Sequence, residues 1–280
     1  MLMGKVTPLL ASKGELIGST DLLLCFHEKT VLLATRDEAV EALPHLSALN
    51  AFLPKDAVPQ PLFASETLGC IYMLDTAKAL DIPPNAGFAY VPVGIFRDLP
   101  SQEEGFCLIS SWHLVTWFRR NRFCGACATP LKHSETERAL CCPNCGQIIY
   151  PSISPAISVA ITDGDRLLMA KGVNASFTHF SLIAGYVEVG ESIEETVARE
   201  AMEEVGLKVK NIRYIASQPW GLSQAEMLGF HAELDGDDKI TLQKSELAEA
   251  HWFHRDEIPL RHQPLSLSFE LIERFRAGVL

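Results

Sequence analysis

Short apolar runs interrupted by turns predict a β-rich first half of the chain. Residues 21–26 and 30–35 flank the polar turn His27-Glu28-Lys29, a pattern typical of a β-hairpin. Two more apolar runs, residues 69–75 and 88–93, lie on either side of a proline-rich breaker and predict further strands. We therefore expect a small mixed α/β domain here, and we find no catalytic motif in it.

A helix and a change of pattern lead into the second half. Residues 111–122 predict a helix with Ser110 or Ser111 as its N-cap, followed directly by a cysteine-rich segment. Further on, apolar strands precede a glycine-containing loop and a charged helix, the order expected of an α/β domain. These strands are residues 156–162, 166–170 and 180–184. The expected domains are an N-terminal mixed α/β domain (1–118), a cysteine ribbon (119–152) and a second domain (153–280).

Four cysteines have the spacing of a zinc ribbon. They form two C-x2-C pairs separated by 14 residues: Cys124, Cys127, Cys142 and Cys145. Four thiolates in this pattern close a tetrahedron around Zn²⁺ and leave no open position, which predicts a structural ion. Cys141 adjoins the second pair, but only Cys142 leaves a two-residue gap to Cys145. Four unrelated buried thiols are the alternative, and this spacing disfavours it.

The charged helix has start and stop signals of its own. Ser192 with Glu195 three residues later is a capping box, and Gly206 suits the C-terminal cap. Apolar residues recur every four positions and predict one buried stripe. The stripe consists of Ile193, Val197, Ala201 and Val205.

The same helix carries three clustered carboxylates. Glu200, Glu203 and Glu204 stand at i, i+3 and i+4, so they share one face and repel one another. A divalent cation such as Mg²⁺ makes such a cluster favourable, whereas a solvated acidic face is the plainer explanation of a charge run. Arg199 lies within reach of Glu195 and Glu203 and is expected to hold them in place.

The segment from Gly185 to Leu207 resembles the Nudix box, G-x5-E-x7-R-E-U-x-E-E-x-G-U, with the small Ala201 at a position usually taken by a larger aliphatic residue. The resemblance implies an α+β protein whose second domain is a Nudix α/β/α sandwich. It also implies Mg²⁺ or Mn²⁺ bound by Glu200, Glu203 and Glu204, with Glu191 and Arg199 in support. Gly185 would let the strand turn into the loop. The general base would be a helix glutamate or the later Glu246, itself a further metal ligand.

A narrower resemblance covers most of the chain. A poorly defined N-terminal domain, the ribbon, Tyr150-Pro151, the box and Ser217-Gln-Pro-Trp220 occur in this order in the NADH pyrophosphatases. That family is homodimeric and splits NAD(H) into AMP and nicotinamide mononucleotide, and some members remove NAD caps from RNA 5′ ends. The implied substrate-binding residues are Tyr186, Tyr150, Gln218, Trp220 and Gly185. Ordinary packing is the alternative role for both tyrosines.

One departure from that family concerns specificity. After Trp220 the family continues Pro-Phe-Pro-x-Ser, whereas this chain has Gly221-Leu-Ser-Gln-Ala225. Buried hydrogen-bond partners carry most substrate discrimination, so the loss makes other substrates a real alternative: ADP-ribose or a dinucleoside polyphosphate. A catalytically silent nucleotide-binding protein is a third hypothesis, which the complete glutamate set argues against.

Composition adds limits on partners and location. The chain has 280 residues, 48% of them hydrophobic, and a net charge of −11, which disfavours extensive contact with nucleic acid. The first residues lack the pattern of a signal peptide, and no run of about 18 apolar residues predicts a membrane span. We therefore expect a cytoplasmic protein whose eight cysteines are free thiols or metal ligands rather than disulfides.

Overall fold

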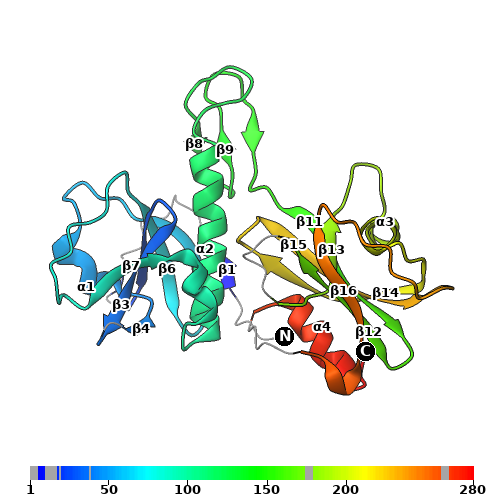
Figure 1. The fold of residues 1–280 in the computed structure, drawn as a ribbon. Helices are drawn as coiled ribbons and strands as arrows, with labels where there is room; N and C mark the ends of the chain where they lie inside the picture. The colour runs from blue at the N-terminus through cyan, green and yellow to red at the C-terminus, as the bar shows by residue number, and fades with distance from the viewer. Residues whose placement is uncertain (1–5, 10–17, 19, 38, 174–178, 260–264) are drawn as a thin grey trace. The chain divides into compact units, whose positions relative to one another are not determined.

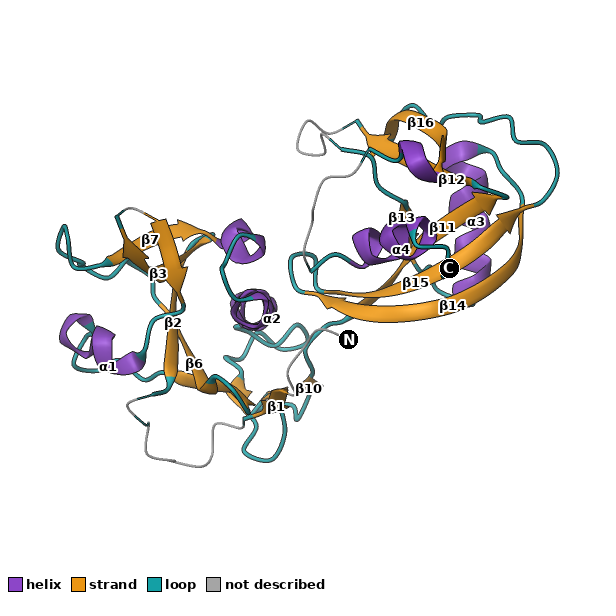
Figure 2. Ribbon diagram, turned by 90° about the horizontal axis from the view of Figure 1, so that it is seen from below, coloured by secondary structure: helices purple, strands orange, loops and turns teal. Residues whose placement is uncertain are grey.

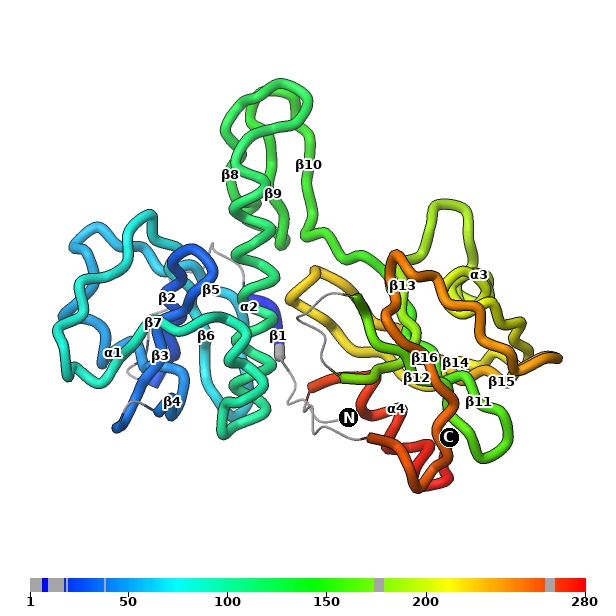
Figure 3. The backbone as a smooth tube through the Cα atoms, viewed as in Figure 1, coloured from blue at the N-terminus to red at the C-terminus, as the bar shows by residue number. Residues whose placement is uncertain are grey.

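The computed structural model of the protein divides into two compact units (Figures 1 and 3). The first comprises residues 1–152 and 221–223, and the second comprises residues 153–220 and 224–280. The described residues are 6–9, 18, 20–37, 39–173, 179–259 and 265–280. Among them, no helix combines the length and the apolar character needed to cross a membrane.

A mixed sheet dominates the first unit. Its strands within the described residues are β1 (Val6–Pro8), β2 (Leu22–His27), β3 (Thr30–Arg36), β4 (Ala39–Ala42), β5 (Gln60–Ser65), β6 (Gly69–Asp75) and β7 (Phe88–Pro92). They lie in the order β1-β5-β6-β2-β3-β4, with β7 also paired to β3. The predicted hairpin is confirmed as β2–β3, in which His27 pairs with Thr30. Short helical segments follow β4 and β7: α1 (Leu46–Leu49), η1 (Asn50–Phe52) and η2 (Val93–Arg97).

The long helix α2 (Gln102–Arg120) corrects the predicted helix over residues 111–122. It begins nine residues earlier, at an N-cap formed by Ser101, whose hydroxyl accepts from the Glu104 amide. Ser111 is buried inside the helix and donates to the Cys107 carbonyl at 2.7 Å. Residues 105–109 are all buried, so the first half of this helix shows no one-sided apolar pattern that sequence analysis could detect.

The ribbon follows α2 as a small antiparallel sheet in the order β10-β9-β8. Its strands are β8 (Lys132–His133), β9 (Leu140–Cys141) and β10 (Ile148–Ile149). A hydrophobic core cannot form in so short a segment, and this is the situation in which a bound metal supplies stability.

The second unit contains a mixed sheet with β11 at its centre (Figure 2). Its strands are β11 (Ser154–Asp163), β12 (Arg166–Gly172), β13 (Ile183–Tyr186), β14 (Val209–Trp220), β15 (Ala225–Leu234) and β16 (Leu247–His254). They run β14-β15-β11-β12-β16, with β13 paired to β11, and β11 is parallel to β15. The predicted third strand begins late: Phe180 lies before β13, and its ring packs against Phe253 with centroids 5.0 Å apart.

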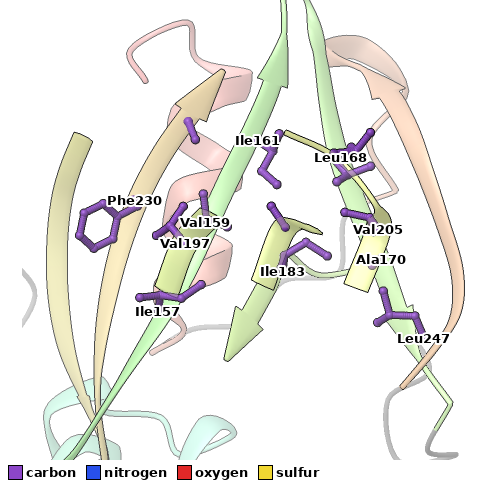
Figure 4. Close-up of a cluster of buried hydrophobic side chains, with 13 residues drawn as sticks. Ile157, Val159, Ile161, Leu168, Ala170, Ile183, Val197, Val205, Phe230 and Leu247 are labelled. Atoms are coloured by element: carbon purple, nitrogen blue, oxygen red, sulfur yellow. The ribbon is translucent and has the colours of Figure 1, made fainter. Parts of the chain in front are cut away.

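Both faces of this sheet are covered, which confirms the α/β/α sandwich. On β11, the alternating Ile157, Val159 and Ile161 pack with helix α3 (Ile193–Val205), whereas Ala160 packs with helix α4 (Leu267–Arg276). Since successive strand residues point to opposite faces, the two helices lie on opposite sides of the sheet. Figure 4 shows the first cluster, with Val197 beside Ile157 and Val159 of β11, and Val205 beside Leu168 and Ala170 of β12. The turn η3 (Arg255–Glu257) connects β16 to the segment before α4.

Helix α3 is built as its sequence predicts. Both hydrogen bonds of the Ser192–Glu195 capping box are present, and Gly206 ends the helix with a φ of +71°. The predicted stripe is buried, with Val197, Ala201 and Val205 fully inaccessible and Ile193 packed at its edge. This burial fixes which side of the helix the glutamates occupy.

Candidate functional site

The three predicted glutamates of α3 differ in their environments. Glu200 and Glu204 are buried, with 8% and 6% of their surfaces exposed, whereas the Glu203 side chain is 53% exposed. Two of the three carboxylates therefore lie in the protein interior, and the third faces solvent.

Arg199 connects the carboxylates of α3 with the loop before the helix and with β13. Its guanidinium donates to Glu191 at 2.6 and 3.1 Å, to Glu200 at 2.7 Å and to Glu203 at 3.1 Å. A further bond, of 2.9 Å, reaches the main-chain carbonyl of Tyr186 at the end of β13. Hydrogen bonding from Arg199 lowers the pKa of Glu191 to about 2, so this carboxylate stays charged at any physiological pH.

The expected partner Glu195 is not part of this network, which corrects the sequence prediction. Its carboxylate accepts from the amide and hydroxyl of Ser192, at 2.8 and 2.9 Å, as the capping box requires. Glu191 takes its place because the loop before the helix folds back, and the hydroxyl of Thr196 also donates to it at 2.9 Å. Spacing along a helix could not reveal a partner that lies before the helix begins.

Gly185 has a different role from the predicted one. It lies inside β13, paired with Ile157 of β11, rather than at the point where the chain turns into the loop. A Cβ atom at this position would lie 2.0 Å from Oε1 of Glu200 and 2.6 Å from Oε2. Glycine is therefore required by space: the Glu200 carboxylate rests against the bare backbone of the strand.

Glu204 is a buried carboxylate without a donor. No hydrogen bond or ion pair reaches its side chain from the residues that the structure describes. Burial, together with the charges of Glu200, Glu246 and Glu203, raises its pKa to about 8. An unpaired buried carboxylate is unfavourable, and an oxygen-seeking divalent cation removes that penalty, so this donor set fits Mg²⁺ or Mn²⁺.

A second segment brings Glu246 to the site. The amide of Thr241 donates to the Val205 carbonyl at 2.8 Å, and the amide of Gln243 donates to the Glu204 carbonyl at 2.9 Å. These bonds satisfy carbonyls that the end of α3 leaves free. Glu246 follows in an exposed position, close enough for its charge to raise the pKa of both Glu204 and Glu200.

The four carboxylates are near one another without forming a tight cage. Across the described part of the chain, the ribbon cysteines are the single group of three or more acidic, histidine or cysteine side chains with ligand atoms this close, all within 4.8 Å. Mg²⁺ typically takes one or two carboxylates and completes its shell with water and substrate phosphate. The looser arrangement on α3 suits that mode of binding.

The ribbon cysteines are gathered as zinc ligands should be. The Sγ atoms of Cys124 and Cys145 are 3.6 Å apart, and that of Cys127 lies 3.4 Å from Cys142 and 3.7 Å from Cys145. Tetrahedral zinc with bonds of about 2.3 Å separates its sulfurs by about 3.8 Å, close to these values. Cys141 lies in β9 and is outside the group. None of the eight cysteines forms a disulfide.

The predicted substrate-binding residues are spread over both units. Tyr186 follows Gly185 and is 49% exposed, and its carbonyl is held by Arg199. Gln218 and Trp220 end β14, where the Gln218 amide donates to the Leu265 carbonyl at 2.7 Å. Tyr150 belongs to the first unit, and its hydroxyl donates to Glu137 at 3.1 Å. The structure thus joins the main chain of Tyr186 to Arg199, while substrate contacts by these residues stay a prediction.

We expect Cys142→Ser to remove the zinc and destabilise the protein, because a structural site depends on all four ligands. Cys141→Ser is the matched control and should be nearly silent. Metal analysis should find one zinc per wild-type chain and markedly less in Cys142→Ser, with a lower unfolding temperature. The opposite ranking of the two variants would contradict this ligand set.

Gly185→Ala should displace the Glu200 carboxylate and weaken Mn²⁺ binding by about tenfold or more, equivalent to about 1.4 kcal/mol. The added methyl group has no room beside Glu200, although β13 itself tolerates alanine. Gly94→Ala is a suitable control because a Cβ there meets no atom within 4 Å. Unchanged Mn²⁺ affinity in Gly185→Ala would show that the close approach to Glu200 does not matter for the metal.

Glu204→Gln should stabilise the protein at pH 8 when Mg²⁺ and Mn²⁺ are absent and zinc is retained. The folded-state pKa of about 8 exceeds that of an unfolded chain, so the wild type loses stability as pH rises from about 4.5 to 8. We expect the variant to gain at least about 1.4 kcal/mol over wild type at pH 8, and far less at pH 5. Denaturant unfolding at both pH values measures this, and an equal difference at both would disprove it.

Comparison with known proteins agrees with this geometry. Residues 153–274 match the NUDIX domain, and residues 119–150 match the NADH pyrophosphatase zinc ribbon domain. The NAD-capped RNA hydrolase NudC of Salmonella paratyphi C is 41% identical over 183 residues, which cover 65% of this chain and 71% of that protein. The protein of the same name from Pseudomonas aeruginosa is 36% identical over 223 residues, 78% of each chain.

Among solved structures, a NUDIX hydrolase from Nitrosomonas europaea covers 56% of this chain and 91% of its own, at 22% identity and a TM-score of 0.49. The sequence relatives and the two matched domains carry the assignment. This chain belongs to the Nudix hydrolase family, within the group that bears an NADH pyrophosphatase zinc ribbon.

Proposed function

We propose that the protein hydrolyses the pyrophosphate bond of NAD(H) with Mg²⁺ or Mn²⁺, giving AMP and nicotinamide mononucleotide. The observation that carries the proposal is the 41% identity to an NAD-capped RNA hydrolase in a chain that keeps Glu200, Glu203 and Glu204. The same bond at the 5′ end of NAD-capped RNA is a second expected substrate. Because the net charge is −11, we expect contact with such an RNA to be confined to its capped end. We also propose a cytoplasmic homodimer.

The side chains of the site have distinct tasks in this reaction. Arg199 and the backbone of Gly185 hold the Glu200 carboxylate in one position. Glu204 lies one helical turn further along α3 and is also buried. Glu200, Glu203 and Glu204 would hold a divalent cation, which would neutralise phosphoryl oxygens and lower the pKa of the attacking water. Glu246, which is exposed and lies outside the Arg199 network, would accept the proton of that water.

A second candidate function is hydrolysis of another nucleoside diphosphate derivative, such as ADP-ribose or a dinucleoside polyphosphate. The supporting observation is the turn between β14 and β15, in which Trp220 pairs directly with Ala225. The family has an aromatic residue and a serine where this chain has Leu222 and Ala225. One lost stacking contact is worth about 0.5–1.5 kcal/mol, so preference for NADH should fall by up to about tenfold.

A hydrolysis panel with Mg²⁺ or Mn²⁺ tests both candidates. The substrates are NADH, NAD⁺, ADP-ribose, diadenosine polyphosphates and NAD-capped RNA, with products identified by mass. Glu203→Gln and Glu204→Gln should each abolish turnover while the fold is retained, since each removes a metal ligand. Glu194→Gln, on an exposed position in the first turn of α3, is the control and should leave the rate unchanged.

The outcomes separate the hypotheses. Near-normal kcat in both Glu203→Gln and Glu204→Gln would contradict the site itself. Cleavage of ADP-ribose or a polyphosphate without cleavage of NADH or NAD⁺ would contradict the first substrate assignment and support the second.

A further inference from the structure

The side-chain amide of Gln243, near the candidate site, has a hydrogen-bond partner at its nitrogen but, among the described residues, none at its oxygen. Its Nε2 donates to Oε1 of Glu246 at 3.2 Å. Its Oε1 is buried and has no hydrogen-bond partner among the described residues. A buried polar atom without a hydrogen-bond partner destabilises a fold, because the atom loses its bonds to water and gains none in return.

The main chain of Gln243 links the end of helix α3 to Glu246. Its amide donates to the Glu204 carbonyl at 2.9 Å. Its carbonyl accepts from the amides of Glu246 and Leu247, at 3.1 and 3.0 Å. These backbone bonds fix the position of the Glu246 main chain. The hydrogen bond from the Gln243 side chain then restrains the Glu246 carboxylate.

The orientation of the amide follows from the charge it faces. If the two ends of the amide were exchanged, the carbonyl oxygen would face the Glu246 carboxylate, and two acceptors would repel each other. The carboxylate thus keeps the nitrogen on its own side and leaves the oxygen in the protein interior. The unpaired oxygen is the consequence of the bond to Glu246.

Glu246 depends on this bond for its position. It is exposed, and no other described side chain donates to its carboxylate. An exposed glutamate ordinarily samples several rotamers, and ordering it costs entropy. The turn that carries Glu246 is joined to the end of α3, since the Gln243 amide donates to the Glu204 carbonyl at 2.9 Å and the Gln243 carbonyl accepts from the Glu246 amide at 3.1 Å, so the held carboxylate lies beside the helix that bears the glutamates.

We propose that Gln243 is a positioning residue that orients the Glu246 carboxylate toward the Glu200 and Glu204 face for proton abstraction. The inference rests on the proposed pyrophosphate hydrolysis, and it adds a residue that touches neither substrate nor metal. Gln243 acts only through Glu246. The orientation that lets its nitrogen donate to Glu246 leaves its buried oxygen without a hydrogen-bond partner among the described residues.

Gln243→Leu tests the proposal, because leucine fills similar space without either amide group. We expect kcat with NADH to fall by about 10- to 100-fold, as for a misplaced catalytic group, while KM stays within about twofold. The unfolding temperature should equal or exceed that of wild type, because the unpaired oxygen is gone. A merely structural residue would show the reverse, a lower unfolding temperature with kcat unchanged, and that result would overturn the proposal. Lys244→Ala, at the exposed neighbouring position, is the control for the loop.

A double-mutant cycle with Glu246→Gln gives the second readout. If Gln243 acts through Glu246, adding Gln243→Leu to Glu246→Gln should cause no further loss of kcat. Losses that multiply, or a Glu246→Gln enzyme with wild-type kcat, would overturn the proposal. The cycle is measured with NADH and ADP-ribose in parallel. Cleavage of ADP-ribose alone would contradict the proposed substrate, and the ADP-ribose cycle would still decide the role of Gln243.

Discussion

The guanidinium of Arg199 is the interaction on which the rest of the site depends. It bonds at once to the loop before α3, to two carboxylates on α3 and to the carbonyl that ends β13. Three separate pieces of chain are thereby held at fixed distances before any cation is bound. A lysine could not replace it, because a planar fork with five donors is needed to reach acceptors in several directions.

Arg199 also sets the charge balance of the site. The single positive charge of Arg199 pairs with Glu191, Glu200 and Glu203. Glu204 and Glu246 add further negative charge nearby. Burial, and after it this excess of negative charge, raises the pKa of Glu204, since the fold gathers more carboxylates than its own cations neutralise. The repulsion among these carboxylates is unfavourable while no metal is bound. Binding a divalent ion would relieve it, and this favours metal binding. The ribbon follows a different principle, since its thiolates replace a hydrophobic core that so short a segment cannot form.

Local signals in the sequence were enough to predict much of the fold. The capping box at Ser192, the stripe through Val197 and Ala201, and the β2–β3 hairpin depend on neighbours within a few residues, and the structure confirms them. Features that depend on distant contacts were missed. The start of α2 was missed although Ser101 and Glu104 stand in N-cap and N3 spacing, because residues 105–109 are all buried and show no one-sided apolar pattern.

The same distinction explains the candidate site. The spacing of Glu200, Glu203 and Glu204 is a property of one helix and could be predicted, whereas the choice of Glu191 over Glu195 depends on how a loop folds back. The role of Gly185 depends on which side chain faces β13 from the helix, and that of Gln243 on a bond across a turn. The box pattern places Gly185 and Glu191 in the site, but helix spacing alone signals none of these three contacts.

The contact between Gly185 and Glu200 also links the site to the correct assembly of the sheet. Gly185 faces the carboxylate only while it pairs with Ile157, because the β11–β13 pairing determines which residue of β13 lies under the helix. A slip by one residue would turn the neighbouring side chains of β13 to the opposite face, and a slip by two would bring Ile183 or Val187 against Glu200. Every misaligned pairing thus places a side chain where only a hydrogen atom fits. The position of the Glu200 carboxylate therefore depends on the correct register between β11 and β13. A misaligned β13 would displace this carboxylate from the candidate metal site.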